Sequence, residues 1–297
     1  MSITIDEALA WECLLDLRAR RRAGDTRQAV GLDSQGRMLA DGAPVLSLHP
    51  AGWDCRLPLT PAARDLLDLY IPMLTAPQHR PFVVGHLGQS LDGRIATDNG
   101  VSQTISGPEN LDHLHRLRAM ADVVLVGAGT VQHDNPRLTT RRVPGDNPTR
   151  VVLDPDCRLA SDCGLFTDHA APTLVFCRES CRSRYTDVAV ETLPCETDGR
   201  LSLPALLDNL VRRGLPVVFV EGGGVTVSAF LQAGLLDLLQ ITVAPMIIGA
   251  GRPGVSLPPP SDLEEALRPP VRTFTMGSDI LFNCYLKAPA WVTGENG

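Results

Sequence analysis

The stretch formed by residues 121–142 constrains the fold of this chain more than any other. It begins with the apolar run VVLV at residues 123–126, which is closed by Gly127 and Gly129. A short β-branched run closed by glycines is typical of a strand that is buried on both faces. Acidic and basic residues follow at once, which is the layout of a ligand-binding loop on an α/β sheet. The stretch therefore predicts a buried strand that opens into a site.

Apolar runs and amphipathic segments alternate along most of the chain. Strands are predicted at residues 81–87, 123–126, 149–154, 173–177, 216–220, 240–243 and 280–285, and helices at residues 6–22, 61–69, 106–120, 203–213 and 225–233. Such alternation indicates an α/β fold whose central sheet is mixed but mostly parallel and flanked by helices. The pattern is weak before residue 79. We expect residues 1–78 to form a small appended region of unknown role and residues 79–297 the main domain.

Composition excludes several classes of function. The 297 residues carry a formal net charge of −7, which argues against a general binder of nucleic acid or of anionic membranes. The first residues lack the basic start of a signal peptide, and no run approaches the roughly 18 apolar residues of a membrane span. The eight cysteines include no Cys-x-x-Cys pair, so we expect reduced thiols in a cytoplasmic protein and no metal site.

Two glycine turns follow predicted strands. The first, at Gly127 and Gly129, lacks the third glycine of a dinucleotide-binding fingerprint, because that position is Gln132, and Pro136 follows too early for a long helix. The second, residues 221–224 (EGGG), could bring backbone N–H groups to an anion at a helix N-terminus. The alternative is a tight turn that only requires glycine. Its acid, at the end of a buried strand, favours a ligand site.

The helix predicted at residues 106–120 carries an arginine on its apolar face. A Ser-x-x-Glu capping box, Ser106 to Glu109, is expected at its start. At 100° per residue, Arg118 falls on the face of Leu111 and Leu114. Such an arginine either extends past the core to solvent or points at a buried anion. The pattern alone leaves both interpretations open.

Several ordered motifs together resemble the reductase domain of the bifunctional riboflavin-biosynthesis deaminase/reductase. The motifs are residues 86–94 (HLGQSLDGR), Ser102, 117–119 (LRA), 126–131 (VGAGTV), 134–141 (DNPRLTTR), 220–223 (VEGG) and 244–249 (APMIIG). They extend over roughly residues 80–286. The resemblance implies a dihydrofolate-reductase-like fold, here without the deaminase domain.

The resemblance also implies an activity, which is NADPH-dependent reduction of a 5-amino-6-(5-phosphoribosylamino)uracil-type substrate to the ribitylamino product. Hydride would pass from the nicotinamide to C1′ of the sugar, with the open-chain imine as acceptor, and the family implies a homodimer. Two alternatives remain: a reductase of the same fold that acts on another pyrimidine or a pterin, and a nucleotide-binding homologue without turnover.

The site residues are carried over by motif position. Ser102, Arg118, Leu138, Arg141 and Glu221 are expected to face the substrate, and Gly88, Thr104, Thr130, Asp134, Gly222, Gly223, Gly224, Val225 and Thr226 to line the cofactor. Arg118 and Arg141 suit the substrate phosphate as charged donors. Asp134, Glu221 and His86 are the expected catalytic residues, the two acids orienting the sugar or assisting proton movement. Arg178, Arg182 and Arg184 either hold the 2′-phosphate of NADPH or form a solvated basic loop.

Three positions depart from the pattern of the family. His86 stands where lysine is usual, Thr104 where tryptophan is frequent, and Asn135 replaces the second acid of an Asp-Asp-Pro motif. An imidazole at position 86 could still donate a hydrogen bond.

Overall fold

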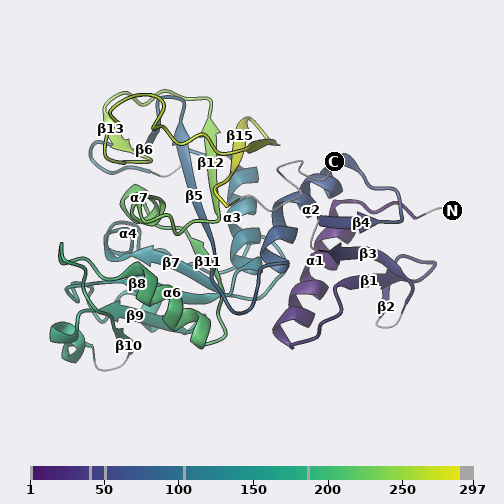
Figure 1. The fold of residues 1–297 in the computed structure, drawn as a ribbon, viewed down its shortest axis with the longest axis horizontal. Helices are drawn as coiled ribbons and strands as arrows, with labels where there is room; N and C mark the ends of the chain where they lie inside the picture. Colours follow the sequence, from purple (N-terminus) through teal and green to yellow (C-terminus); the bar gives the residue numbers. More distant parts are fainter. Residues whose placement is uncertain (1–2, 40–41, 50–51, 103–104, 186–187, 288–297) are drawn as a thin grey trace. The chain divides into compact units, whose positions relative to one another are not determined.

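The computed structural model describes residues 3–39, 42–49, 52–102, 105–185 and 188–287 of the chain. They form two compact units that meet in the sequence between Ala76 and Pro77. Each unit has its own sheet (Figure 1). All the residues proposed above as site residues belong to the second unit. No helix among the described residues is long and apolar enough to cross a membrane.

The first unit packs two helices with a small antiparallel sheet. Its elements are α1 (Glu7–Arg22), β1 (Ala29–Leu32), β2 (Met38–Leu39), β3 (Pro44–His49), β4 (Gly52–Cys55) and α2 (Pro61–Leu74), and the strand order is β2-β1-β3-β4. Asp6 caps α1 by accepting from Leu9 N–H at 2.9 Å, and Thr60 caps α2 by accepting from Ala63 N–H at 3.2 Å. Both predicted helices are confirmed. The sheet was not predicted, because its strands are short and their alternation is weak.

The second unit is built on a nine-stranded sheet in the order β10-β9-β8-β7-β11-β5-β12-β15-β14. The strands are β5 (Phe82–Ser90), β7 (Val123–Gly127), β8 (Thr149–Leu153), β9 (Thr173–Cys177), β10 (Ala189–Thr192), β11 (Val217–Val220), β12 (Leu238–Ala244), β14 (Val271–Met276) and β15 (Asp279–Tyr285). The first seven strands of this order, from β10 to β12, are mutually parallel. The next strand, β15, pairs antiparallel with β12, and the edge strand β14 pairs antiparallel with β15. The prediction of a mixed, mostly parallel α/β sheet is confirmed.

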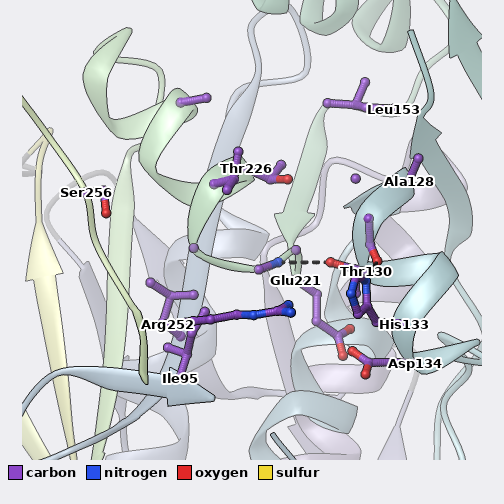
Figure 2. Close-up of a pocket in the computed structure, with 18 of the residues that line it drawn as sticks. Ile95, Ala128, Thr130, His133, Asp134, Leu153, Glu221, Thr226, Arg252 and Ser256 are labelled. Carbon is purple, nitrogen blue, oxygen red and sulfur yellow. Dashed lines mark hydrogen bonds between the residues drawn. The ribbon is translucent and has the colours of Figure 1, made fainter. Parts of the chain in front are cut away.

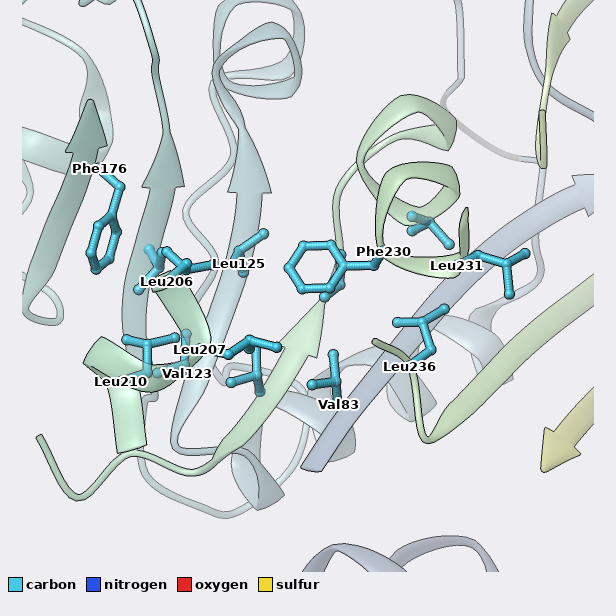
Figure 3. Packing of buried hydrophobic residues seen from close by; sticks show 14 of the residues in the cluster. Val83, Val123, Leu125, Phe176, Leu206, Leu207, Leu210, Phe230, Leu231 and Leu236 are labelled. Atoms are coloured by element: carbon cyan, nitrogen blue, oxygen red, sulfur yellow. The ribbon is translucent and has the colours of Figure 1, made fainter. Parts of the chain in front are cut away.

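Helices cover both faces of this sheet. On one face, α6 (Leu203–Arg212) and α7 (Gly224–Gln232) pack leucines and Phe230 against Val83, Val123 and Leu125 of the strands (Figure 3). On the other face lies α3 (Pro108–Met120), whose Asn110 and His113 bond side chains of β5 and β12. The remaining elements are β6 (Arg94–Thr97), α4 (Ala128–Asp134), α5 (Gly164–Thr167), the 3-10 helix η1 (Glu179–Arg184) and β13 (Gly251–Pro253).

The start of α3 differs from the prediction. Gly107 is the N-cap residue and no side chain of the expected capping box caps the helix. Instead, Asp279 of β15 accepts a hydrogen bond from Gly107 N–H at 2.8 Å. The capping-box prediction is therefore wrong, because a carboxylate far away in the sequence takes the role.

The parallel order brings the carboxyl ends of β7, β8 and β11 to one edge of the sheet. In open α/β sheets, ligands bind outside this edge. The loops that follow these strands include both glycine turns.

Candidate active site

A cavity of about 1600 Å³ lies at this edge of the sheet. Most of the proposed site residues line it, namely His86, Gly88, Ser102, Thr130, Asp134, Glu221, Gly222, Gly223, Gly224, Val225 and Thr226. Arg118, Leu138 and Arg141 are not among its lining residues, and Thr104 lies outside the described residues. A cavity of this size could hold a dinucleotide together with a small substrate.

The second glycine turn joins β11 to α7 at the wall of the cavity. Thr130 of α4 accepts a hydrogen bond from Gly223 N–H at 3.2 Å (Figure 2). A side chain on Gly224 would collide with the carbonyl oxygen of Gly254, so the loop after β13 packs directly on the turn. The first amides of α7 have no partner within the helix, which makes the turn a candidate anion site.

Glu221, at the end of β11, forms an ion pair with Arg118 of α3. Arg118 Nε donates to Oε2 at 2.7 Å and Nη2 donates to the other oxygen, so the pair is bidentate. Nη1 of Arg118 donates to the carbonyl oxygen of Thr139 at 2.9 Å. The arginine thus points at a buried anion, but this anion belongs to the chain. Its donors are directed at protein oxygens, and the phosphate contact expected of Arg118 stays a prediction.

The loop after α4 is held in an unusual backbone conformation. Asn135 and Leu138 have positive φ values of 39° and 53°. Asparagine tolerates this region better than most residues, and Asn135 Oδ1 also accepts from Gly164 N–H at 3.1 Å. The departure at Asn135 is thus explained by the backbone. Leu138 is buried, so packing holds its strained backbone in place, and its side chain lies outside the cavity where contact with the substrate was expected.

His115 of α3 fixes the end of this loop. Its Nδ1 accepts a hydrogen bond from Arg141 N–H at 2.8 Å. Burial, followed by the charges of Arg118, Arg141 and Arg142, lowers the pKa of His115 to about 4, so the ring is neutral and keeps its acceptor at pH 7. This role of His115 was not predicted, because it depends on a contact with a distant loop.

Positive charge accumulates around Glu221. Burial, Arg118 and Arg137 all lower the pKa of Arg141, while Glu221 raises it. The charges of Arg118 and Arg137 thus add to that of Arg141, and this local positive charge is suited to a phosphate. Arg141 is exposed and donates from Nη1 to Thr139 Oγ1 at 2.9 Å, so most of its donors remain available.

The middle of the cavity contains two carboxylates and a cation. The side chains of Glu221 and Asp134 point into the same space, and Arg252 of β13 extends toward it from the opposite wall (Figure 2). Asp134 and Arg252 are both exposed. Arg252 was not predicted as a site residue, because a single arginine in a glycine-rich loop carries no local signal.

His86 lines the cavity from β5, where it takes part in a buried polar layer beneath α3. Its Nε2 lies 3.1 Å from Asn110 Oδ1 and 3.2 Å from Thr242 Oγ1. Burial lowers the pKa of His86 to about 4, and the hydrogen bond to Asn110 opposes this shift only in part. His86 is therefore neutral at pH 7. Gly88, two residues on, has no room for a side chain because a Cβ would collide with Ser106 Oγ.

The far end of the cavity lies between β8 and the loop that precedes α6. Arg158, Arg178 and Arg200 line it, and Arg178 is paired with Asp156 at 2.7 Å. Of the three arginines suggested for the 2′-phosphate, Arg182 and Arg184 do not line this cavity. Arg178 is thus the one of these three that lines the cavity, beside Arg158 and Arg200, which were not predicted.

Residues 81–282 match the family model described as the RibD C-terminal domain. The chain is 36% identical over 218 residues to the 2,5-diamino-6-ribosylamino-4(3H)-pyrimidinone 5′-phosphate reductase of Methanothermobacter thermautotrophicus, covering 70% of this chain and 99% of that protein. It is 30% identical over 234 residues to the riboflavin biosynthesis protein RibD of Bacillus amyloliquefaciens, covering 77% of this chain and 62% of that protein.

A solved structure also resembles the chain. It is the diaminohydroxyphosphoribosylaminopyrimidine deaminase/5-amino-6-(5-phosphoribosylamino)uracil reductase of Thermotoga maritima, with a TM-score of 0.59 and 28% identity. The match covers 77% of this chain and 64% of that protein. The chain thus spans nearly the whole of the archaeal reductase but less than two thirds of the RibD relative and of the Thermotoga deaminase/reductase.

Proposed function

Because this chain belongs to the RibD C-terminal domain family, we propose that it is an NADPH-dependent reductase of a ribosylamino-pyrimidine 5′-phosphate in riboflavin biosynthesis. We assign the activity to the domain predicted at residues 79–297 and propose that the protein acts in the cytoplasm. Residues 1–78 are assigned no role. The observation that carries the proposal is one cavity that contains a glycine turn at a helix N-terminus and two carboxylates, of which Glu221 is paired with Arg118 of a neighbouring cluster of arginines.

The cavity fits a nicotinamide dinucleotide. In the glycine turn, the backbone amides of Gly222 and Gly224 would bind a pyrophosphate, while that of Gly223 donates to Thr130. Arg252 reaches the same region from the opposite wall. Arg178 and its neighbours at the far end suit the 2′-phosphate of NADPH. When bound, the cofactor supplies the hydride.

The residues of the chain would then bind the substrate and move a proton. Arg137 and Arg141 bind the substrate phosphate, while Arg118 holds Glu221 in place. Glu221, as an ion-paired carboxylate, stabilises positive charge that develops at C1′ of the sugar. Asp134 is exposed to the cavity and transfers the proton that opening of the sugar ring requires.

Purified protein tests the proposal directly. With NADPH and the ribosylamino-pyrimidinone phosphate, we expect loss of absorbance at the nicotinamide band in proportion to ribitylamino product. Binding of NADPH without turnover of this substrate would favour a paralogue that acts on another pyrimidine or a pterin. Failure to bind NADPH would contradict the proposal and favour a homologue without catalytic function.

Replacing Arg141 with alanine should raise the KM for the phosphorylated substrate by about 10-fold to 100-fold, because a charged hydrogen bond contributes roughly 1.5–3 kcal/mol. The KM for NADPH should stay constant. Arg142→Ala is the matched control, since Arg142 is the next residue but pairs with Asp112 at 2.5 Å. An unchanged substrate KM in Arg141→Ala would remove Arg141 from the phosphate site.

The homodimer expected for the family has a candidate surface on the sheet. Ile280 and Phe282 of β15 are 47% and 37% exposed, and Val271 on the edge strand β14 is 49% exposed. Ile241 and Val243 of β12 pair with Phe282 and Ile280, so they lie on the same face. A continuous apolar sheet face of this kind is typical of an interface between protomers.

Substituting Phe282 with glutamate should therefore shift the protein from dimer to monomer, because the change puts a charge in the centre of the apolar face. Sedimentation velocity at micromolar concentration measures the outcome. Leu263→Glu is the control, since Leu263 is 77% exposed and outside this face. A wild-type protein that sediments as a monomer would contradict the dimer outright.

A further inference from the structure

Arg252 differs from the other arginines that line the cavity, because its charge is not compensated by the chain. The other three have carboxylate partners, in the pairs Arg158–Asp154, Arg178–Asp156 and Arg200–Asp198. Within the part of the chain that the structure describes, Arg252 has no carboxylate within ion-pair distance and no hydrogen-bond partner. Its guanidinium therefore brings a positive charge and free donors into the cavity.

The direction of the Arg252 side chain is set by close contacts of the backbone around it. Strand β13 pairs with β6, with Arg252 opposite Ala96, and a side chain on Gly251 would collide with the Ala96 carbonyl oxygen. The guanidinium lies over Gly100, where a Cβ would come within 2.9 Å of Nη2. The missing side chains of two glycines thus leave room for the strand and for the guanidinium, and no donor of Arg252 is used to hold it.

The groups that face Arg252 across the cavity leave a place for an anion. Of the two carboxylates in this space, Glu221 is paired with Arg118, and Asp134 forms no ion pair with Arg252 (Figure 2). The glycine turn on the same wall as Glu221 begins the nine-residue helix α7, whose N-terminus carries partial positive charge. An anionic group between this turn and the guanidinium would be attracted by both.

The order of charges along the cavity indicates which phosphate this is. The paired arginines at the far end suit the 2′-phosphate of the cofactor, and the carboxylates Glu221 and Asp134 mark the reacting end. The diphosphate of a dinucleotide lies between these ends, with the phosphate on the nicotinamide side nearer to the carboxylates. The substrate phosphate is assigned to Arg137 and Arg141, which do not line the cavity.

We propose that Arg252 binds the nicotinamide-side phosphate of the cofactor and so positions the nicotinamide beside Glu221 and Asp134. This inference rests on the proposed function. A guanidinium can donate two parallel hydrogen bonds to a phosphate, which fixes the orientation of the phosphate as well as its position. Arg252 thereby links the strand pair β6–β13 to the reacting end of the cofactor.

Equilibrium binding of three nucleotides, measured by isothermal titration calorimetry, tests the assignment. NADPH carries both phosphates of the diphosphate, adenosine 2′,5′-bisphosphate carries only the adenosine-side one, and adenosine 2′-monophosphate carries neither. Arg252→Ala should raise the Kd of NADPH by about 10-fold to 100-fold, the range that one charged hydrogen bond produces. The Kd values of the two adenosine nucleotides should stay within about two-fold of wild type.

Two further variants separate a lost contact from a disturbed fold. Arg252→Lys keeps the charge but lacks the planar pair of donors, so it should restore part of the affinity for NADPH. Arg94→Ala is the matched control, because Arg94 lies on the paired strand β6 but outside the cavity lining, and donates to the Gly249 carbonyl oxygen at 3.1 Å. This control should bind NADPH like the wild type.

An unchanged Kd of NADPH in Arg252→Ala would overturn the inference. Equal losses for NADPH and adenosine 2′,5′-bisphosphate would also overturn it, because the contact would then be to the adenosine-side phosphate. Equal losses for all three nucleotides would show a disturbed cavity and would remove the specific role of Arg252. A wild-type protein that does not bind NADPH would instead contradict the proposed function itself.

Discussion

Glu221→Gln is expected to lower kcat by about 10²-fold to 10³-fold, the typical loss when one group that stabilises transition-state charge is removed. The carboxylate is held at the cavity by the bidentate Arg118 pair. In the proposed reaction its negative charge would stabilise the positive charge that develops on the sugar. Glutamine keeps the shape and one oxygen acceptor but removes the charge. The KM for NADPH should change little.

The same substitution should also reduce stability, which the sequence alone did not suggest. Arg118 and Glu221 have side chains only 9% and 14% exposed, and breaking such a pair leaves a buried guanidinium with weaker partners. We expect a loss of about 2–4 kcal/mol in the free energy of unfolding, measured by urea denaturation. Glu264→Gln, at an exposed acid outside the cavity, is the control for both measurements. Wild-type kcat in Glu221→Gln would remove this residue from the chemistry.

Asp134→Asn is expected to lower kcat by about 10²-fold to 10⁴-fold, because the amide cannot transfer the proton that ring opening requires. Asp134 is exposed and ends α4, so the free energy of unfolding should stay within about 0.5 kcal/mol of wild type. Loss of activity with an unchanged melting temperature would distinguish the role of Asp134 from that of Glu221, whose substitution should lower both activity and stability. Asp98→Asn, an exposed loop acid outside the cavity, is the control. Full activity in Asp134→Asn would assign the proton transfer to another group.

Local sequence carried enough information for most of the sheet of the second unit. Runs such as VVFV at β11 are buried on both faces, and strands in that environment consist almost wholly of apolar residues, which the sequence shows directly. The strands of the first unit were missed because they are short and belong to a small antiparallel sheet with little alternation. The start of α3 was misassigned because Asp279, more than a hundred residues away, caps it.

The site could be predicted as a set of residues but not as a set of contacts. The motif order was sufficient to bring Thr130, Asp134 and Glu221 to one cavity. The motif order could not reveal that Arg118 donates hydrogen bonds to Glu221, because the two residues are 103 positions apart in the sequence. The position of Arg252 at the cavity could not be predicted for the same reason. Its position depends on the loop that packs against Gly224, a contact between distant segments of the chain.

The central place of β5 in the sheet affects how the chain folds during its synthesis on the ribosome. It is the first strand of its sheet to be synthesised, yet both of its partners, β11 and β12, come much later, with Phe82 paired to Val217 and Val84 to Leu238. At typical translation rates of about 5–20 residues per second, the nascent chain would carry β5 with two unpaired edges for roughly 7–27 s. Apolar strands with open edges are prone to association with other chains. The nascent chain should therefore be a stronger substrate for ribosome-associated chaperones than the finished domain, whose central strand has no free edge.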